Sequence, residues 1–127
     1  MKKFPFFIFA IVGLFFACKK EPGEGGRASI KGKVKMIDTI GGNQGEYFLP
    51  NEDVFIIYGE EDDIYDDDTK TNYDGSFQFK NLRKGTYRVF VYTNDASSPS
   101  GISPVIKSVE ISSNKEMVEV ETIVVYK

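Results

Sequence analysis

The chain has 127 residues, a formal net charge of −3, no histidine, no tryptophan and one cysteine. This length suits a single domain of ordinary size. Histidine is the side chain that most often acts as acid, base or metal ligand near neutral pH, so its absence predicts a non-enzymatic protein without a cofactor. The acidic balance argues against a nucleic acid partner, because phosphate recognition depends on Lys and Arg.

The first 17 residues have the pattern of an export signal. Lys2 and Lys3 give a short positive start, residues 4–17 form an apolar run, and charged residues 19–21 end it. A spanning helix needs about 20 apolar residues, so the run is too short for a permanent anchor. We predict a signal peptide over residues 1–17. A plain secretory leader, or a short leader that stays uncleaved, is the alternative.

The end of this run, Leu14-Phe15-Phe16-Ala17-Cys18, resembles a bacterial lipoprotein signal. In that signal a small residue precedes a cysteine that is lipidated on sulfur and becomes the first residue after cleavage. Leu14 stands one place early for the usual box, and the phenylalanine-rich leader resembles those of Bacteroidetes. The resemblance implies fatty acyl (palmitate) chains on Cys18, with membrane lipid as partner. Several chains give a lasting hold, since each buried CH₂ contributes about 0.8 kcal/mol.

The residues after Cys18 indicate the membrane to which the protein is delivered. In proteobacterial lipoproteins an Asp directly after the cysteine retains the protein in the inner membrane, and here Lys19 occupies that place. We therefore expect delivery to the outer membrane. The charged residues 19–21 resemble, in part, the tag that exports Bacteroidetes lipoproteins to the cell surface, so the periplasmic and surface sides both stay open. The glycine-rich residues 22–26 complete a predicted flexible tether over residues 18–26.

Alternation of apolar and polar side chains predicts strands from residue 27 onward. Ala28, Ile30, Val34 and Met36 share one face of the first strand, and lysines with Ser29 occupy the other. Turn residues such as Asp74-Gly75 separate the later runs. Further strands are expected over residues 54–58, 75–82, 85–94, 103–111 and 118–126, with a weaker one over 64–72. These runs predict an all-β antiparallel β-sandwich of six to seven strands without helices.

Two stretches, LPNEDVFI and TKTNYDGSFQFKNLRKGTYRVFVY, resemble the carboxypeptidase regulatory-like domain. The resemblance spans about residues 28–95 and implies a transthyretin-like (prealbumin-like) sandwich over residues 27–127. Asn51 and Glu52 replace the family's usual Gly-Ala. The matched positions are expected to serve the core and the turns, and they are Thr71, Asp74, Gly75, Phe77, Phe79, Leu82, Gly85, Tyr87 and Val89.

Two groups of residues are candidates for sites. Phe90 and Tyr92 alternate with core positions, so we expect them to be exposed and to contact a protein or glycan. Residues 60–68, the acidic segment, carry seven carboxylates and are expected to form a solvated loop that protects a sheet edge. A calcium site is the alternative reading, although the spacing lacks the pattern of an EF-hand. Its ligands would come from Asp62, Asp63, Asp66, Asp67 and Asp68.

Together these features predict a lipid-anchored, non-enzymatic protein whose β-sandwich is a binding or scaffolding module of the cell envelope. The partner would be an envelope protein or a polysaccharide. A structural accessory subunit of an outer membrane transport or secretion complex is the alternative.

Overall fold

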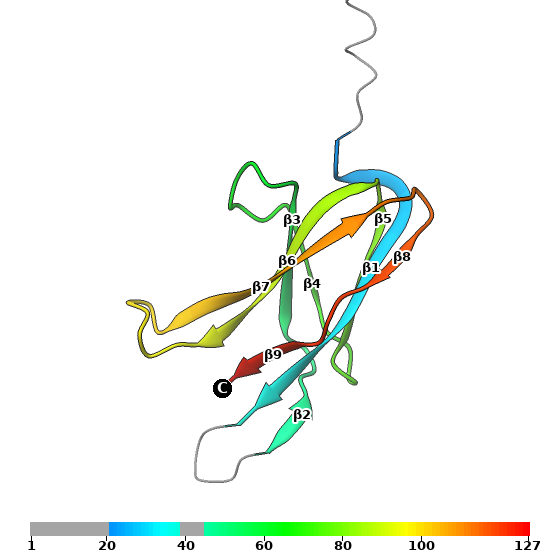
Figure 1. The fold of residues 1–127 in the computed structure, drawn as a ribbon. Helices are drawn as coiled ribbons and strands as arrows, with labels where there is room; N and C mark the ends of the chain where they lie inside the picture. The colour runs from blue at the N-terminus through cyan, green and yellow to red at the C-terminus, as the bar shows by residue number, and fades with distance from the viewer. Residues whose placement is uncertain (1–20, 39–44) are drawn as a thin grey trace, which may run out of the picture.

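The computed structural model describes residues 21–38 and 45–127, which form nine strands and no helix (Figure 1). No helix in these ranges has the length and apolar character to cross a membrane. Cys18 and the predicted signal peptide lie outside the described residues. The strands are β1 (Glu24–Ile37), β2 (Glu46–Phe48), β3 (Asp53–Tyr58), β4 (Asp67–Lys70), β5 (Ser76–Leu82), β6 (Gly85–Asn94), β7 (Ile102–Ile111), β8 (Met117–Glu119) and β9 (Ile123–Tyr126).

The strands form two sheets. In the first sheet the long strand β1 pairs antiparallel with β2 and β5 and parallel with β8 and β9. The second sheet has the order β4-β3-β6-β7, with every pair antiparallel. The predicted all-β sandwich is therefore confirmed, although it has more strands than expected and is not wholly antiparallel.

The last two strands account for that difference. The run over residues 118–126 is divided between β8 and β9, and both join β1 in the first sheet. Residues 112–116 carry the chain across from β7, since Glu116 N donates to Ser113 O (3.3 Å) and Ser29 N donates to Glu116 O (3.0 Å). The predicted turn at Ser113-Asn114 is present, but it connects strands of different sheets.

The core lies between the two sheets and follows the predicted alternation. Ile30, Val34, Tyr87 and Val89 are fully buried, and Phe77 and Phe79 join them from β5. Ser29, expected on the polar face, is also buried. The pairing of β1 with β5 shifts register on either side of Ala28, so the strand is irregular where Ser29 lies.

The predicted turn at Asp74-Gly75 connects β4 with β5. Gly75 has φ +79°, its N–H donates to Asn72 O (2.9 Å), and Asn72 N donates to Ser76 O (2.8 Å). The Ser76 hydroxyl and backbone N–H donate to Asp74 Oδ1 (2.6 and 3.1 Å) and hold the pKa of that carboxyl below its usual value. Side-chain and backbone donors thus fix the turn that aligns β5 with β1.

The chain before residue 27 belongs to the folded body, so the prediction of a flexible tether over residues 22–26 is wrong. Gly23 N donates to the Tyr87 hydroxyl (2.9 Å), and Arg83 N donates to Gly23 O (2.8 Å). Arg83 Nε donates to Glu21 O (2.6 Å). Composition resembles a linker here, but the glycines let the backbone approach the β5–β6 turn closely.

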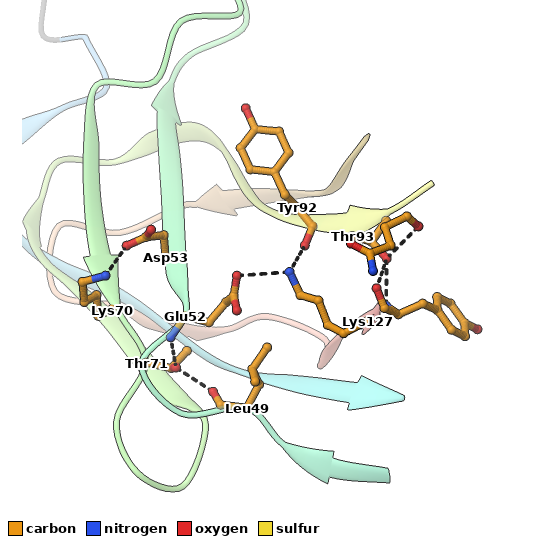
Figure 2. Close-up of polar contacts among 10 residues, drawn as sticks. Leu49, Glu52, Asp53, Lys70, Thr71, Tyr92, Thr93 and Lys127 are labelled. Atoms are coloured by element: carbon orange, nitrogen blue, oxygen red, sulfur yellow. Dashed lines mark hydrogen bonds and ion pairs between the residues drawn. The ribbon is translucent and has the colours of Figure 1, made fainter. Parts of the chain in front are cut away.

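The opposite end of the sandwich is held by polar contacts (Figure 2). The Thr71 hydroxyl donates to Leu49 O (2.6 Å) and accepts from Glu52 N (2.9 Å). The Thr93 hydroxyl on β6 accepts from Tyr126 N on β9 (2.8 Å), which connects the two sheets. The end of β6 is therefore fixed from both sheets.

Candidate binding surface

The outer face of the second sheet carries side chains that the core does not use. Asp68, Phe55, Phe90 and Ile106 are successive cross-strand neighbours on β4, β3, β6 and β7. Directly opposite residues share a face of a sheet. Because Val89 and its neighbours on alternate positions point into the core, this row points outward.

Four rings gather along this row, and we call them the aromatic cluster: Phe55, Tyr65, Phe90 and Tyr92. The Phe55 ring lies 4.8 Å from that of Tyr65 and 5.0 Å from that of Phe90, measured between centroids. Tyr92 is edge-on to Phe90 (5.5 Å) and to Phe55 (5.7 Å). These separations and the tilted or edge-on arrangements are the ones that aromatic pairs favour. The cluster is thus one contiguous packed surface.

The expectation that Phe90 is exposed is wrong. Its side chain is 6 % exposed, because Phe55 stacks on it and Tyr92 packs against its edge. Tyr92 is 36 % exposed and Tyr65 is 50 % exposed. The two tyrosines therefore present the cluster to solvent, and the two phenylalanines support them.

The sequence interpretation missed Phe55 and Tyr65. Phe55 lies in a nearly continuous apolar run, which hides the alternation that would have assigned it to the outer face. Tyr65 lies within the acidic segment, which was interpreted through its charges alone. Its ring reaches Phe55 from the connection between β3 and β4.

Polar contacts hold the backbone that carries Tyr92. Its carbonyl oxygen accepts a hydrogen bond from Lys127 Nζ (3.2 Å), and that ammonium also contacts Glu52 Oε1 (3.4 Å). Figure 2 shows the Tyr92 ring pointing away from these contacts. With Thr93 bonded to β9, the backbone that carries Tyr92 is held from the side opposite its ring.

The surface continues onto β7. Ile102 and Ile106 are 41 % and 49 % exposed, and Ile106 lies directly opposite Phe90. Pro104 lies opposite Tyr92 on the same strand. Because β7 is an edge strand of this sheet, a proline there removes a donor that a foreign strand would otherwise pair with.

The acidic segment is fastened beside the aromatic cluster by Arg88. This side chain lies on the outer face, opposite Ile57 on β3 and Ser108 on β7. Its guanidinium binds Asp63 Oδ1 (2.9 Å), donates to Gly59 O (3.3 Å) and donates to Asp62 O. The segment is therefore an ordered border of the surface.

The carboxylates of this segment are spread along the chain, and three of them accept from nearby backbone N–H groups. Asp66 Oδ2 accepts from Tyr58 N (2.7 Å), Asp62 Oδ1 from Ile64 N (3.2 Å) and Asp67 Oδ1 from Asp68 N (2.8 Å). Within residues 21–38 and 45–127, no three His, Cys, Asp or Glu side chains are gathered as a metal would require. The geometry does not support the alternative calcium site at Asp62, Asp63, Asp66, Asp67 and Asp68.

These charges also act on Tyr58 at the end of β3. Burial, with the nearby carboxylates of Asp67, Glu24 and Asp66, raises the pKa of Tyr58 to about 12. Its ring lies edge-on to Tyr87 (5.8 Å). Burial likewise raises the pKa of Tyr87. Both phenols are neutral at physiological pH, which suits packing and hydrogen bonding.

No model of a known protein family matches the sequence, and no curated protein matches it. Among solved structures, a Pseudomonas aeruginosa protein described as a "putative carbohydrate binding protein" aligns with 15 % identity over 88 % of this chain and 94 % of its own, with a TM-score of 0.51. The TIE protein of Bacillus anthracis aligns with 20 % identity over 76 % of this chain and 17 % of its own, with a TM-score of 0.46. The first likeness shows a shared fold. The resemblance to the carboxypeptidase regulatory-like domain stays a prediction.

Proposed function

We propose that the chain is a non-enzymatic bacterial envelope lipoprotein, held by acyl chains on Cys18, whose β-sandwich binds a polysaccharide through the aromatic cluster. The observation that carries this proposal is the pair of exposed rings, Tyr65 and Tyr92, supported by Phe55 and Phe90 on a rigid sheet face. The lipoprotein-like end of the leader and the resemblance to the carboxypeptidase regulatory-like domain agree with a module of this kind.

The chemistry of the surface suits a sugar. A tyrosine ring offers an apolar face for the C–H face of a sugar ring and a phenol for its hydroxyls. Carboxylates have several acceptor positions, so Asp62 and Asp66 have capacity beyond their single backbone bonds to accept from hydroxyls. The Pseudomonas protein of similar length and fold, described as carbohydrate binding, supports this choice of ligand.

Affinity electrophoresis of the full chain in gels that contain soluble polysaccharides tests the binding surface. Tyr92→Ala and Tyr65→Ala should each weaken retardation about 2- to 13-fold, since one aromatic contact contributes roughly 0.5 to 1.5 kcal/mol. The control is Tyr73→Ala, because Tyr73 is 92 % exposed in the turn before β5 and its ring takes part in none of the ring pairs of the cluster. Equal retardation of all variants would remove the aromatic cluster as the site.

The anchor is tested separately. Cells that express the wild type or Cys18→Ser are fed a palmitate analogue, and the protein is then examined for label. Incorporation in the wild type alone is expected. Protease treatment of intact cells then shows whether the domain lies on the surface or in the periplasm of an outer membrane, which the proposal leaves to this experiment.

The same cells discriminate the alternative, a structural subunit of an outer membrane transport or secretion complex. Isolation of a stoichiometric protein complex that survives Tyr92→Ala would favour that alternative. Loss of polysaccharide retention in Tyr92→Ala, without loss of any protein partner, would favour the binding module.

A further inference from the structure

We propose that the polysaccharide bound at the aromatic cluster is uncharged, and that the carboxylates around the cluster reject anionic polymers. This inference rests on the proposed function and names its ligand class. It follows from where the charges of the outer face lie and which of them are already paired.

Carboxylates border the aromatic cluster closely. Asp68 is the direct cross-strand neighbour of Phe55 on β4. Asp53 lies two residues before Phe55 on the same face. Arg88 fixes the acidic segment against this face through Asp63. A polymer lying along the rings therefore passes near several negative charges.

The cations near the cluster are engaged by these same carboxylates. Arg88 binds Asp63 (2.9 Å), and Lys70 binds Asp53 (2.7 Å). Lys127, behind Tyr92, contacts Glu52 (3.4 Å). Recognition of a uronate, sulfate or phosphate depends on a cation that is available to bind it. In the described part of the chain, the strands β3, β4, β6 and β7 direct no further Lys or Arg to this face.

The outer face of the first sheet has the opposite charge, since lysines predominate there. Lys31, Lys33 and Lys35 alternate along β1 on that face. Its acids, Glu119 and Glu46, pair with Lys31 (3.8 Å) and Lys35 (3.4 Å). The negative potential is therefore a local property of the surface with the rings, and it is not a uniform property of an acidic protein.

A glycan explains this surface better than a protein partner does. The exposed apolar side chains are spread along the strands, whereas a stable protein interface buries about 800 Å² on each partner around an apolar centre. The edge strands β4 and β7 carry Asp68, Lys70 and Pro104, which oppose addition of a foreign strand. Separate half-exposed rings with nearby acceptors suit a chain of hydroxyl-rich sugar rings.

Matched pairs of polymers test the inference on the full chain. Neutral glucan, mannan, xylan and galactan are compared with the carboxymethylated form of each by affinity electrophoresis. A neutral polymer that binds should do so at least about tenfold more tightly than its charged form at low salt. The difference should shrink at about 1 M salt, where the screening length falls to about 3 Å.

Two double variants connect the selectivity to the charges of this face, namely Asp68 opposite Phe55 and Asp62 in the acidic segment. Asp62→Asn with Asp68→Asn should raise affinity for the carboxymethylated polymer, because Asn keeps an acceptor oxygen and loses the charge. Glu46→Gln with Glu119→Gln is the matched control. It removes the same charge from the other outer face and should leave the selectivity unchanged.

The outcomes separate the two proposals. Tyr92-dependent binding of neutral and charged polymers with equal affinity would overturn this inference and leave the polysaccharide-binding function in place. Binding to none of these polymers would overturn both. Retention of polylysine in place of the polymers would reassign the surface to a cationic polypeptide and would also overturn both.

Discussion

Gly75 lies where a side chain would have no room. A Cβ atom there would be 2.8 Å from Val34 O and 2.7 Å from Phe48 Cβ, and the residue has φ +79°. Gly75→Ala should lower the free energy of unfolding by about 2 to 4 kcal/mol, because left-handed strain adds to the clash. Urea denaturation measures the loss.

Gly101 provides the control for that prediction. It has nearly the same conformation, φ +80°, and nothing lies within 4 Å of its ideal Cβ position. Gly101→Ala should therefore cost only the backbone strain, about 1 kcal/mol. Equal losses for the two substitutions would mean that the contact between the β4–β5 turn and β1 is not rigid.

Ionisation of Tyr58 makes the free energy of unfolding depend on pH in the alkaline range. Its pKa is about 12 in the folded chain against an ordinary value of 10.0. A group with a raised folded pKa contributes stability that is fully present below its unfolded pKa and is lost as pH rises through its folded pKa. The free energy of unfolding should therefore fall between about pH 10 and about pH 12.

Tyr58→Phe should have a smaller loss of stability over this interval, because it has no phenol to ionise. Tyr73→Phe is the control, since it alters a side chain that is 92 % exposed, and it should follow the wild-type profile. Urea midpoints measured from pH 8 to 12 compare the three proteins. A Tyr58→Phe profile that coincides with the wild type would show that the raised pKa of this phenol does not cause the alkaline loss of stability.

At the level of elements, the start of β1 should contribute to stability although it resembles a linker. A chain that begins at Arg27 loses the bonds of Gly23 to Tyr87 and Arg83, and leaves those partners without them. We expect it to be about 2 to 4 kcal/mol less stable than a chain that begins at Glu21, at about 1 kcal/mol for each hydrogen bond. Thermal and urea denaturation of both chains check this.

A double-mutant cycle shows whether residues 21–26 stabilise the fold through their contact with the hydroxyl of Tyr87. Tyr87→Phe should destabilise the chain that begins at Glu21 more than the chain that begins at Arg27, since contacting groups are not additive. Identical losses in the two chains would show that residues 21–26 do not depend on this contact.

Alternation along a strand predicted the structure well, whereas residue composition did not. Strict alternation assigned the inward positions of β5 and β6 correctly, because a strand with one buried face must repeat every two residues. Glycine content over residues 22–26 was misleading. Gly26 is there because an added Cβ would lie 2.0 Å from Leu82 O, a contact that composition cannot indicate.

The periodicity of the sequence also does not show which elements pack against or pair with one another. The outward direction of Phe90 was predicted, but its burial depends largely on Phe55, which stacks on it from another strand. Likewise the apolar run over residues 118–126 predicted extended structure without indicating a parallel partner in β1. The half of the binding surface that β6 provides, Phe90 and Tyr92, was thus accessible from the sequence, whereas Phe55 and Tyr65 required the fold.

At the scale of the molecule, the ordered start of the chain constrains how a lipid-anchored protein would lie on its membrane. Glu21 is bonded to Arg83, three residues after Cys18, which allows at most about 11 Å of extended chain. Pro22 packs beside Gly85, so the β5–β6 turn would face the bilayer. Figure 1 shows the start of β1 at this end and the C-terminus at the other.

The strand β6 then sets the distance of the binding surface from the lipid. It runs from Gly85 to Asn94, ten residues that span about 33 Å. Tyr92 lies near its far end. An acylated chain would therefore present the Tyr92 end of the aromatic cluster sideways and away from the bilayer, where an extended polymer has access.

Single fluorophores test this orientation on the acylated protein in vesicles that carry a quencher on their headgroups. Lys115→Cys places a label near Arg27, whose N–H donates to Asn114 O (3.1 Å), and Ser97→Cys places one in the β6–β7 turn. Acylation of the only native cysteine leaves each introduced thiol as the single reactive site. The Lys115→Cys label should be strongly quenched, whereas the Ser97→Cys label, about 30 Å further along β6, should be nearly unaffected. Equal quenching of the two labels would show that the body tumbles on its anchor, and the fixed orientation would then be wrong even if Cys18 carries lipid.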